Sequence, residues 1–168
     1  LQAKLGDKIR VVRAPCMGRC DLAPVAEVGH HHVDKATIET VAKAATAGHV
    51  HPDMPPYEDL TAYIAGGGYR LMKDCLSGKR SADELIAIME SSGLRGLGGA
   101  GFPSGRKWRF VRQEPKPRLM AINADEGEPG TFKDRVYLEA HPHRFLEGML
   151  VAAWVVEATD VYIYLRDE

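Results

Sequence analysis

The sequence predicts an α/β fold with two parts, a small N-terminal unit and a larger unit built around parallel β-strands. Leu119–Ile122 is a short apolar run of the kind that is buried in a parallel sheet. An amphipathic helix is expected from Pro142 to about Glu157, and Val161–Leu165 (VYIYL) is expected to be the next strand. The order strand, polar loop, helix, strand is typical of a βαβ unit with a right-handed crossover.

Length and charge limit the classes of protein that fit this chain. Its 168 residues can bury the core of one domain or of two small ones. The net charge of -1 argues against a nucleic-acid partner. No apolar run approaches the roughly 20 residues of a membrane span, and the opening LQAKLGDK is not a signal peptide. We therefore expect a soluble cytoplasmic protein without a direct membrane span, and the missing initiator Met suggests a fragment or a processed chain.

The N-terminal unit is expected to contain strands that lead into a helix. Lys8–Arg13 (KIRVVR) is rich in Val and Ile and is predicted to be a strand. A second apolar piece, Pro24–Val28, precedes Gly29-His30, which suits a two-residue hairpin turn of type II′. His31–Val33 is then the return strand of the predicted hairpin.

Helices are predicted from capping signals and from the spacing of apolar residues. Thr37 is expected to cap the start of a helix that Gly48 ends. Ser81 and Glu84 form a predicted capping box, and Gly93 is expected to close the helix that follows them. Shorter helical pieces are expected at Glu58–Ala65 and Tyr69–Leu76.

A proline-rich stretch divides the chain near residue 50. The run HVHPDMPPY (49–57) contains three prolines and shows no periodicity, which is typical of an inter-domain linker. The predicted divisions are 1–50, then a linker and short helix at 51–65, and then 66–168.

The stretch SSGLRGLGGAGFPSGRK (91–107) is dense in glycine and carries three cations, Arg95, Arg106 and Lys107. Glycine allows positive φ angles and lets a ligand touch backbone amides. Exposed N–H groups with flanking cations bind anions, particularly where a helix starts just after the loop, so a phosphate-bearing ligand is expected here. A flexible glycine-rich connector is the alternative.

Two further stretches carry polar or reactive side chains. Asn123, Asp125, Glu126 and Glu128 follow a predicted core strand, where ligands of open α/β sheets bind; the alternative is a solvated turn. Among the three cysteines, an odd number that favours thiols or metal ligands over disulfides, two form C-x3-C. That spacing lets two thiolates from one loop reach a single metal centre; two ordinary small apolar residues near a turn are the alternative.

The cysteine stretch carries a family resemblance. PCMGRCDLAPVAEVG, followed by a hairpin and a helix, resembles the second half of the thioredoxin-like [2Fe–2S] domain of NADH dehydrogenase modules. The resemblance implies that Cys16 and Cys20 are two of the four cluster ligands. The other two ligands are then expected upstream of Leu1.

A longer resemblance covers roughly Gly67 to Glu168. GLRGLGGAGFPSGRKW followed by INADEGEPGTFKDR resembles the FMN-binding, NADH-oxidising flavoprotein family of respiratory complex I, NAD-reducing hydrogenases and NAD-dependent formate dehydrogenases. It implies that this part is the beginning of a Rossmann-like FMN/NADH-binding domain. The fusion of both parts, and the wording GRCDLAPV and HPDMPPYEDL, resembles the β (diaphorase) subunit of molybdenum-dependent formate dehydrogenases most closely.

Matching positions imply the following roles. The implied FMN-binding residues are Gly96, Gly98, Gly99, Lys107, Asn123, Asp125, Glu126 and Gly127. The implied NADH-binding residues are Gly99, Ala100, Phe102, Phe110 and Glu128. Both phenylalanines have core packing as the alternative role. No protein side chain is assigned as catalytic, because hydride transfer is the chemistry of the cofactors.

The expected function is therefore that of an NADH:acceptor oxidoreductase subunit, the diaphorase of a formate dehydrogenase, which transfers hydride between NAD(H) and FMN and single electrons to iron–sulfur clusters. The flavoprotein of complex I or of an NAD-reducing hydrogenase is the alternative, and a cofactor-free scaffold module is an alternative of another class. Expected partners are a small [2Fe–2S] subunit and a molybdenum or other catalytic subunit. A [4Fe–4S] site is expected beyond residue 168.

Overall fold

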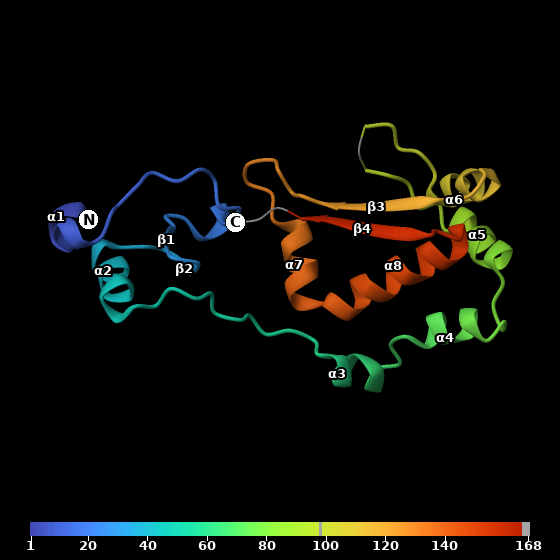
Figure 1. Cartoon of the computed structure of the whole chain (residues 1–168), viewed down its shortest axis with the longest axis horizontal. Coiled ribbons are helices and arrows are strands. Elements are labelled where there is room, and N and C mark those ends of the chain that lie inside the picture. The colour runs from blue at the N-terminus through green and yellow to red at the C-terminus, as the bar shows by residue number, and fades with distance from the viewer. Residues whose placement is uncertain (98, 166–168) are drawn as a thin grey trace. The chain divides into compact units, whose positions relative to one another are not determined.

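The computed structural model describes residues 1–97 and 99–165, which form two compact units (Figure 1). The first unit comprises Leu1–Pro56 together with Asp125–Val136. The second comprises Tyr57–Ala124 together with Tyr137–Leu165. Within the described ranges, no helix is both long and apolar enough to cross a membrane.

The first unit is built from short elements. It contains α1 (Gln2–Leu5), two 3-10 helices (Gly6–Lys8 and Cys20–Leu22), β1 (Ala26–Val28), β2 (His31–Val33) and α2 (Ile38–Ala47). The predicted hairpin is confirmed, since β1 and β2 pair antiparallel with Val28 opposite His31. Gly29 takes φ 66°, the left-handed value that the first turn position needs.

The strand predicted at Lys8–Arg13 is wrong. Residues 9–13 adopt no regular secondary structure, and Val12 is 60% exposed. In place of a ladder partner, the Val11 N–H donates to the Gln2 side-chain oxygen at 3.0 Å. A run rich in Val and Ile becomes a strand only where a neighbouring strand takes up its backbone groups, and the apolar composition alone does not show that neighbour.

Helix α2 begins and ends where its capping residues predict. The Thr40 N–H donates to the Thr37 hydroxyl at 3.2 Å, and the Thr40 hydroxyl takes the Thr37 N–H at 2.9 Å. Gly48 follows the helix with φ 68°, and its backbone N–H donates to carbonyls of the last turn. The buried residues Val41 and Ala44 pack with Val33 of the hairpin, so the helix covers β2.

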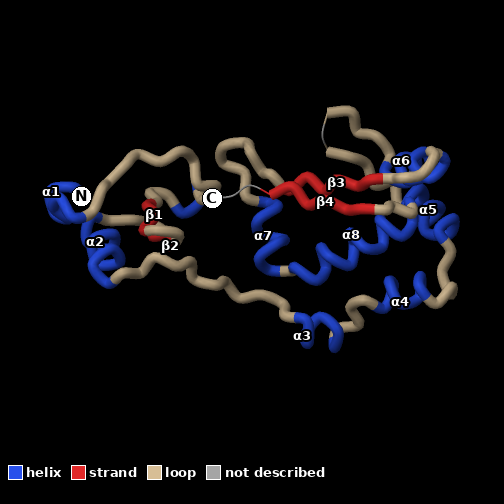
Figure 2. Tube along the Cα trace, in the orientation of Figure 1, coloured by secondary structure: helices blue, strands red, loops and turns tan. Residues whose placement is uncertain are grey.

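The second unit is mostly helical and packs around α8. Its helices are α3 (Leu60–Ala65), α4 (Arg70–Leu76), α5 (Ala82–Ser91), α6 (Ser104–Gln113) and α8 (Pro142–Val156), and α7 (Lys133–Ala140) begins in the first unit and ends in the second. Figure 2 shows that α8 lies alongside the strands of the second unit. A buried cluster joins α4, α5 and α8; its members are Cys75, Ala82, Leu85, Ile86, Val151 and Val155. Trp108 and Trp154 pack against this cluster.

The predicted parallel strand pair is confirmed. β3 (Leu119–Ala124) and β4 (Asp160–Leu165) pair in parallel, with Leu119 opposite Asp160 and Ala124 opposite Leu165. β3 therefore continues past Ile122, where the sequence pattern predicted its end. Asn123 lies inside the strand opposite Tyr164 and not in the loop after it, because pairing with β4 extends the strand beyond its apolar run.

The capping box predicted for α5 forms only in part. The Ser81 hydroxyl accepts the Glu84 N–H at 3.1 Å. The Glu84 carboxylate does not return to the Ser81 N–H; it forms an ion pair with Arg80 instead. A strong local cation therefore competes with the weaker backbone donor for this carboxylate.

Gly105 allows α5 and α6 to approach closely. A Cβ placed on Gly105 would lie 2.6 Å from the backbone nitrogen of Glu90 in α5. Next to this approach, Arg109 donates to both carboxylate oxygens of Glu90 at 2.9 and 2.7 Å. The small residue and the bidentate pair together fix α6 against α5.

We expect Gly105→Ala to destabilise the protein by about 1–3 kcal/mol, because the added methyl group forces the two helices apart. Urea unfolding measures the effect. Gly148→Ala, within α8, is the matched control: its Cβ would meet nothing within 4 Å, and Ala favours helix, so stability should stay equal or rise. Equal stability of Gly105→Ala and the native protein would contradict the close-approach interpretation.

Candidate functional site

The glycine-rich stretch forms a hairpin-like loop that opens directly into α6. The Gly96 N–H donates to the Phe102 carbonyl at 3.0 Å, and the Ser104 N–H donates to the Leu94 carbonyl at 2.9 Å. Gly99 takes φ 42° at the tip of this loop, in the left-handed region. Gly96, Gly99 and Ala100 are exposed, whereas Gly98 lies outside the described residues. A helix thus starts just after the loop, as the anion-binding interpretation requires.

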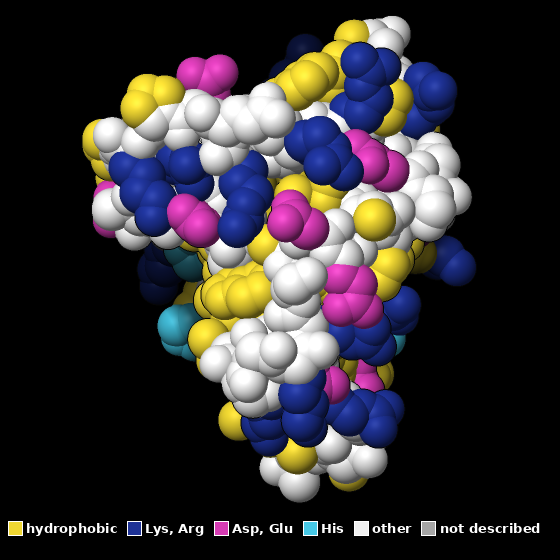
Figure 3. All heavy atoms as spheres, turned by 90° about the vertical axis from the view of Figure 1, so that its right-hand side faces the viewer, with side chains coloured by type: hydrophobic (Ala, Val, Ile, Leu, Met, Phe, Trp, Pro, Cys, Tyr) yellow, Lys and Arg dark blue, Asp and Glu magenta, His cyan; other side chains and the backbone are white. Residues whose placement is uncertain are grey.

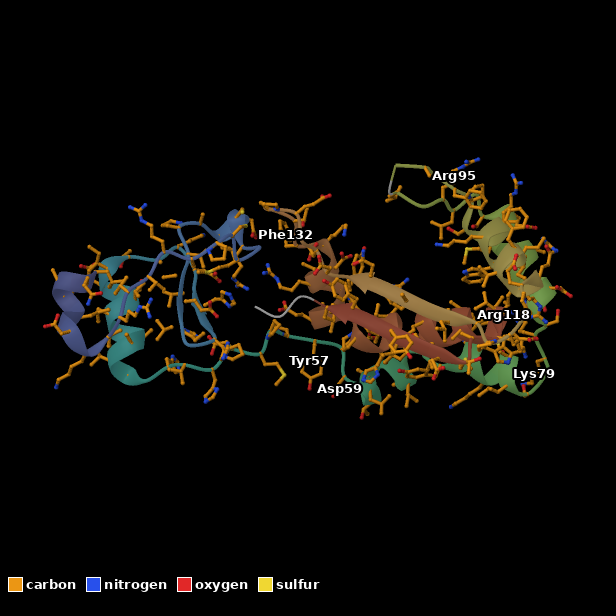
Figure 4. The ribbon with its side chains drawn as sticks, turned by 45° about the horizontal axis from the view of Figure 1, so that its top comes forward. Tyr57, Asp59, Lys79, Arg95, Arg118 and Phe132 are labelled. Atoms are coloured by element: carbon orange, nitrogen blue, oxygen red, sulfur yellow. The ribbon has the colours of Figure 1, made fainter. Side chains whose placement is uncertain are left out.

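Cations surround this loop. Arg95, which Figure 4 labels on the loop, donates to the Gly101 carbonyl at 3.1 Å and so braces the tip. Arg106 and Lys107 are exposed in the first turn of α6. Figure 3 looks onto the side of the second unit that carries α5 and α6, and it shows Lys and Arg side chains spread over this face with Asp and Glu among them. The loop therefore offers backbone N–H groups and positive charge to an anion.

Phe102 and Phe110 form an exposed aromatic pair beside the same loop. Their ring centroids lie 6.1 Å apart, and the side chains are 42% and 46% exposed. The Arg106 guanidinium lies 5.9 Å from the Phe102 ring and 5.6 Å from the Phe110 ring. An exposed aromatic pair with a cation over it can stack a flat heterocycle and hold a negative group next to it.

The polar residues after β3 belong to the first unit and are arranged around the start of α7. The Glu126 carboxylate accepts the Asp134 N–H at 2.9 Å and the Arg135 N–H at 3.0 Å, so it satisfies the first turn of α7. Gly127 lies against the Asp125 carboxylate, which a Cβ on this glycine would approach to 2.7 Å. The Glu128 carbonyl accepts the Thr131 hydroxyl at 2.7 Å, which closes the turn.

Cys16 and Cys20 lie together on one loop of the first unit. Their Sγ atoms are 3.7 Å apart, and Cys20 is exposed. The neighbouring Cys16 thiol, through its hydrogen bond and its charge, raises the pKa of the Cys20 thiol. Among the residues described, no group of three or more His, Cys, Asp and Glu side chains is arranged to hold a metal ion. The loop alone therefore offers two thiol ligands.

Two arginines hold this cysteine loop. Arg19, between the cysteines, forms a bidentate pair with Asp34 at 2.8 and 2.7 Å and lowers the pKa of that carboxyl group. Arg135 of α7 donates to the Met17 carbonyl at 3.3 Å and to the Gly18 carbonyl at 2.9 Å. Both carbonyls belong to residues between the cysteines.

The predicted FMN and NADH residues are thus divided between two units, and each set is described within its own unit. Gly96, Gly99, Lys107 and Asn123 belong to the second unit, and Asp125 to Glu128 belong to the first. The sequence predicted Arg106 only as a cation beside the glycine loop and not as a partner of the aromatic pair, and it assigned no role to Arg135. The spacing of Arg106, four residues from each of Phe102 and Phe110 on or next to one helix, is a signal that could have found it.

A glycine loop that opens a helix, an exposed aromatic pair and a parallel strand pair define an α/β domain suited to anionic, nucleotide-like ligands. Residues 89–168 match the family model of the Nuo51 FMN-binding domain, so this part of the chain belongs to the FMN-binding NADH dehydrogenase flavoprotein family.

Several proteins of established name are similar to this chain. An NADH-quinone oxidoreductase subunit of Rhizobium meliloti is 48% identical over 117 residues, which are 69% of this chain and 28% of that protein. An NADH-quinone oxidoreductase subunit of Aquifex aeolicus is 40% identical over 134 residues, 80% of this chain and 29% of that protein. The mitochondrial NADH-ubiquinone oxidoreductase 51 kDa subunit of Neurospora crassa is 52% identical over 91 residues, 51% and 18% respectively. The chain therefore spans less than a third of the length of these relatives.

Solved structures of an NAD+-reducing [NiFe]-hydrogenase are similar as well. The air-oxidized state aligns with a TM-score of 0.66 and 28% identity, and the H2-reduced state aligns with a TM-score of 0.66 and 30% identity. Each alignment covers 89% of this chain and 29% of that one. The α/β fold predicted from the sequence is therefore confirmed.

Proposed function

We propose that this chain is part of an NADH:acceptor oxidoreductase flavoprotein that binds FMN and NAD(H). The observation that carries the proposal is the glycine loop at the start of α6, which lies inside the matched residues 89–168 and is flanked by cations. The loop has the two features that a flavin phosphate needs, exposed N–H groups and positive charge.

The proposed FMN site uses the residues implied by the sequence motifs. Gly96, Gly98 and Gly99 contact the ribityl-phosphate and the edge of the flavin ring, and Lys107 supplies positive charge near the ring. Asn123, Asp125, Glu126 and Gly127 are proposed, from the motif alone, to hold the ribityl hydroxyls and the polar ring atoms. The Glu126 carboxylate also accepts two N–H groups from the first turn of α7.

The proposed NADH site lies on the aromatic pair. Phe102 and Phe110 stack the adenine ring, and Arg106 above both rings stabilises the negative charge of the adenosine phosphates. Gly99 and Ala100 approach the nicotinamide half, and Glu128 takes ribose hydroxyls. FMN bound here would supply hydride acceptance from NADH and single-electron transfer, and the residues of the chain would position NADH for that chemistry.

The cysteine loop is proposed to provide two ligands of a [2Fe–2S] cluster. Two thiolates on one tetrahedral metal with bonds of about 2.3 Å lie about 3.8 Å apart. The observed Sγ–Sγ distance of 3.7 Å in the C-x3-C loop supports this role. The two remaining ligands, and the [4Fe–4S] site of the family, are proposed to belong to the whole protein.

The similar proteins favour the alternative function, that of the flavoprotein of complex I or of an NAD-reducing hydrogenase. Their names are those of NADH-quinone oxidoreductase and NAD+-reducing hydrogenase subunits. The formate dehydrogenase diaphorase stays a prediction that rests on GRCDLAPV and HPDMPPYEDL. Metal analysis of the complex isolated through this protein separates the possibilities: molybdenum supports a formate dehydrogenase, nickel a hydrogenase, and neither metal a quinone-reducing complex.

We propose the cytoplasm as the location of this protein.

The flavoprotein proposal is tested on the purified full-length protein. The expected result is flavin absorbance in the visible range together with NADH-dependent reduction of a dye. A colourless protein that reduces no dye, even after reconstitution with FMN, would support the cofactor-free scaffold instead.

Phe102→Leu and Phe110→Leu should each raise the KM for NADH about tenfold, because stacking a base on an aromatic ring contributes about 1–3 kcal/mol. Flavin content should not change. Tyr162→Leu, which removes an aromatic side chain that is 60% exposed on β4, is the control and should leave KM unchanged. An unchanged KM in both phenylalanine variants would remove the aromatic pair from the NADH site.

A further inference from the structure

We infer that Arg135 is a positioning residue for the C-x3-C loop: it holds the two thiols in the geometry of cluster ligands and adds positive charge next to the cluster. The inference rests on the proposed cluster role of Cys16 and Cys20. It goes beyond that role because it places a determinant of the iron–sulfur site within the motif that the sequence connects with FMN.

The first support is the hydrogen bonding of the Arg135 guanidinium. Nη1 donates to the Met17 carbonyl at 3.3 Å, and Nη2 donates to the Gly18 carbonyl at 2.9 Å. These two residues lie between the cysteines, so the guanidinium restrains the loop segment that sets the distance between the two sulfurs. A planar guanidinium with two donors fixes such a loop better than a single ammonium.

A glycine next to these contacts also shapes the loop. Gly18 takes φ 65°, a left-handed value, and a Cβ there would lie 3.4 Å from Nη1 of Arg135 and from the Thr131 carbonyl. The positive φ angle is what favours glycine at this position. The bidentate pair between Arg19 and Asp34 also restrains this loop.

Arg135 is itself held in place. The Glu126 carboxylate, whose side chain is 10% exposed, accepts the backbone N–H of Arg135 at 3.0 Å and that of Asp134 at 2.9 Å. Glu126 thus fixes the first turn of α7, from which Arg135 projects onto the cysteine loop. The contact connects the polar loop that follows β3 to the cysteine pair, within one unit.

The charge of Arg135 also matches the chemistry of the pair. Two cysteine thiolates that ligate iron place negative charge on this loop, and the Arg135 guanidinium on the loop carbonyls adds a fixed positive charge to the same loop. The same charge favours the reduced, more negative state of a bound cluster and raises its reduction potential.

The test uses the full-length holoprotein with Arg135→Leu and Arg135→Lys. Iron per chain, the electron paramagnetic resonance signal of the reduced [2Fe–2S] cluster and its midpoint potential are measured. Because residues behind metal ligands change metal affinity about 10–100-fold, Arg135→Leu should lose the cluster to a chelator at least about tenfold faster. Its remaining cluster should have a lower potential. Arg135→Lys keeps the charge, so its potential should stay near that of the native protein while cluster loss is intermediate.

Lys43→Leu is the control, because it removes an exposed cation of α2 from the same unit. It should leave both the rate of cluster loss and the potential unchanged. Unchanged FMN content in all variants shows that the protein still folds. If the native protein contains iron and Arg135→Leu shows the same rate of cluster loss and the same cluster potential, the inference about Arg135 is overturned while the proposed cluster role stands. A native protein without the [2Fe–2S] signal would overturn the proposed cluster role itself.

Discussion

Gly99→Val should lose FMN during purification, with an affinity for the flavin weaker by about tenfold or more. A Cβ on Gly99 would meet nothing within 4 Å, so a valine side chain would project into the open space beside the loop. In the proposed FMN site, the flavin approaches the loop N–H groups from this space. A β-branched residue at φ 42° also costs about 1–3 kcal/mol of backbone strain, which can distort the tip.

Gly93→Val is the matched control for this variant. Gly93 also has a left-handed φ, 70°, and open space around a Cβ, but it lies at the end of α5 and not at the tip of the loop. Both variants should therefore lose similar stability in urea, whereas only Gly99→Val should lose flavin absorbance after gel filtration. If Gly99→Val retained FMN as the native protein does, the tip of the loop would not contact the flavin.

The second large effect is expected at Glu147, in the middle of α8. Its carboxylate accepts the Tyr63 hydroxyl of α3, the Tyr69 N–H at 2.7 Å and the Met72 N–H at 3.3 Å. Tyr69 also hydrogen-bonds His143 at 3.1 Å, one turn earlier on α8. Burial, followed by the bond to Glu147, raises the pKa of Tyr63 to about 12. One carboxylate thus fastens α3 and the start of α4 to α8.

Glu147→Ala should destabilise the protein by about 2–3 kcal/mol, because a half-buried hydroxyl and two backbone N–H groups lose their acceptor. Urea unfolding measures the loss. Glu139→Ala removes an exposed glutamate of α7 and should change stability by less than about 0.5 kcal/mol. Equal effects of the two substitutions would show that Glu147 does not anchor the two helices.

The contribution of Glu147 should also depend on pH in a defined direction. Burial raises the pKa of its carboxyl group, but the hydrogen bonds from Tyr63 and from the backbone N–H groups outweigh burial, and the pKa falls below the usual 4.5. The stabilisation is therefore present above pH 4.5 and is lost as the pH falls through the lower folded-state value. The stability difference between the native protein and Glu147→Gln should stay constant at neutral pH and shrink in that acidic range.

Other polar contacts in the second unit could not be predicted from a local sequence pattern. Arg118, labelled in Figure 4, donates to the Val156 carbonyl at 2.9 Å and pairs with Glu157. Arg112 donates to the Val155 carbonyl at 2.6 Å. These cations bind the C-terminal carbonyls of α8, where the helix dipole favours positive charge. Nothing in the spacing of Arg112 and Arg118 indicated that their partners lie at the end of a helix far along the chain.

Local patterns predicted the elements whose signals lie within a few residues. The hairpin at Gly29, the caps of α2 and the helix that begins at Pro142 were predicted because turn chemistry, capping and periodicity act over one or two turns. The strand at Lys8–Arg13 failed and the end of β3 was misplaced for one reason: a strand needs a partner, and the partner does not appear in the strand's own sequence.

By itself, the sequence determined the α/β class, the two motifs and the chemistry of the side chains that they carry. Only the tertiary structure decided which distant groups those side chains meet. Arg135 reaches a carbonyl 117 residues away, and Tyr63 reaches a carboxylate 84 residues away. Gly105 is needed for its contact with another helix and not for its φ angle. The physical reason is that packing and long-range hydrogen bonds depend on where the folded chain brings its segments, which no local spacing records.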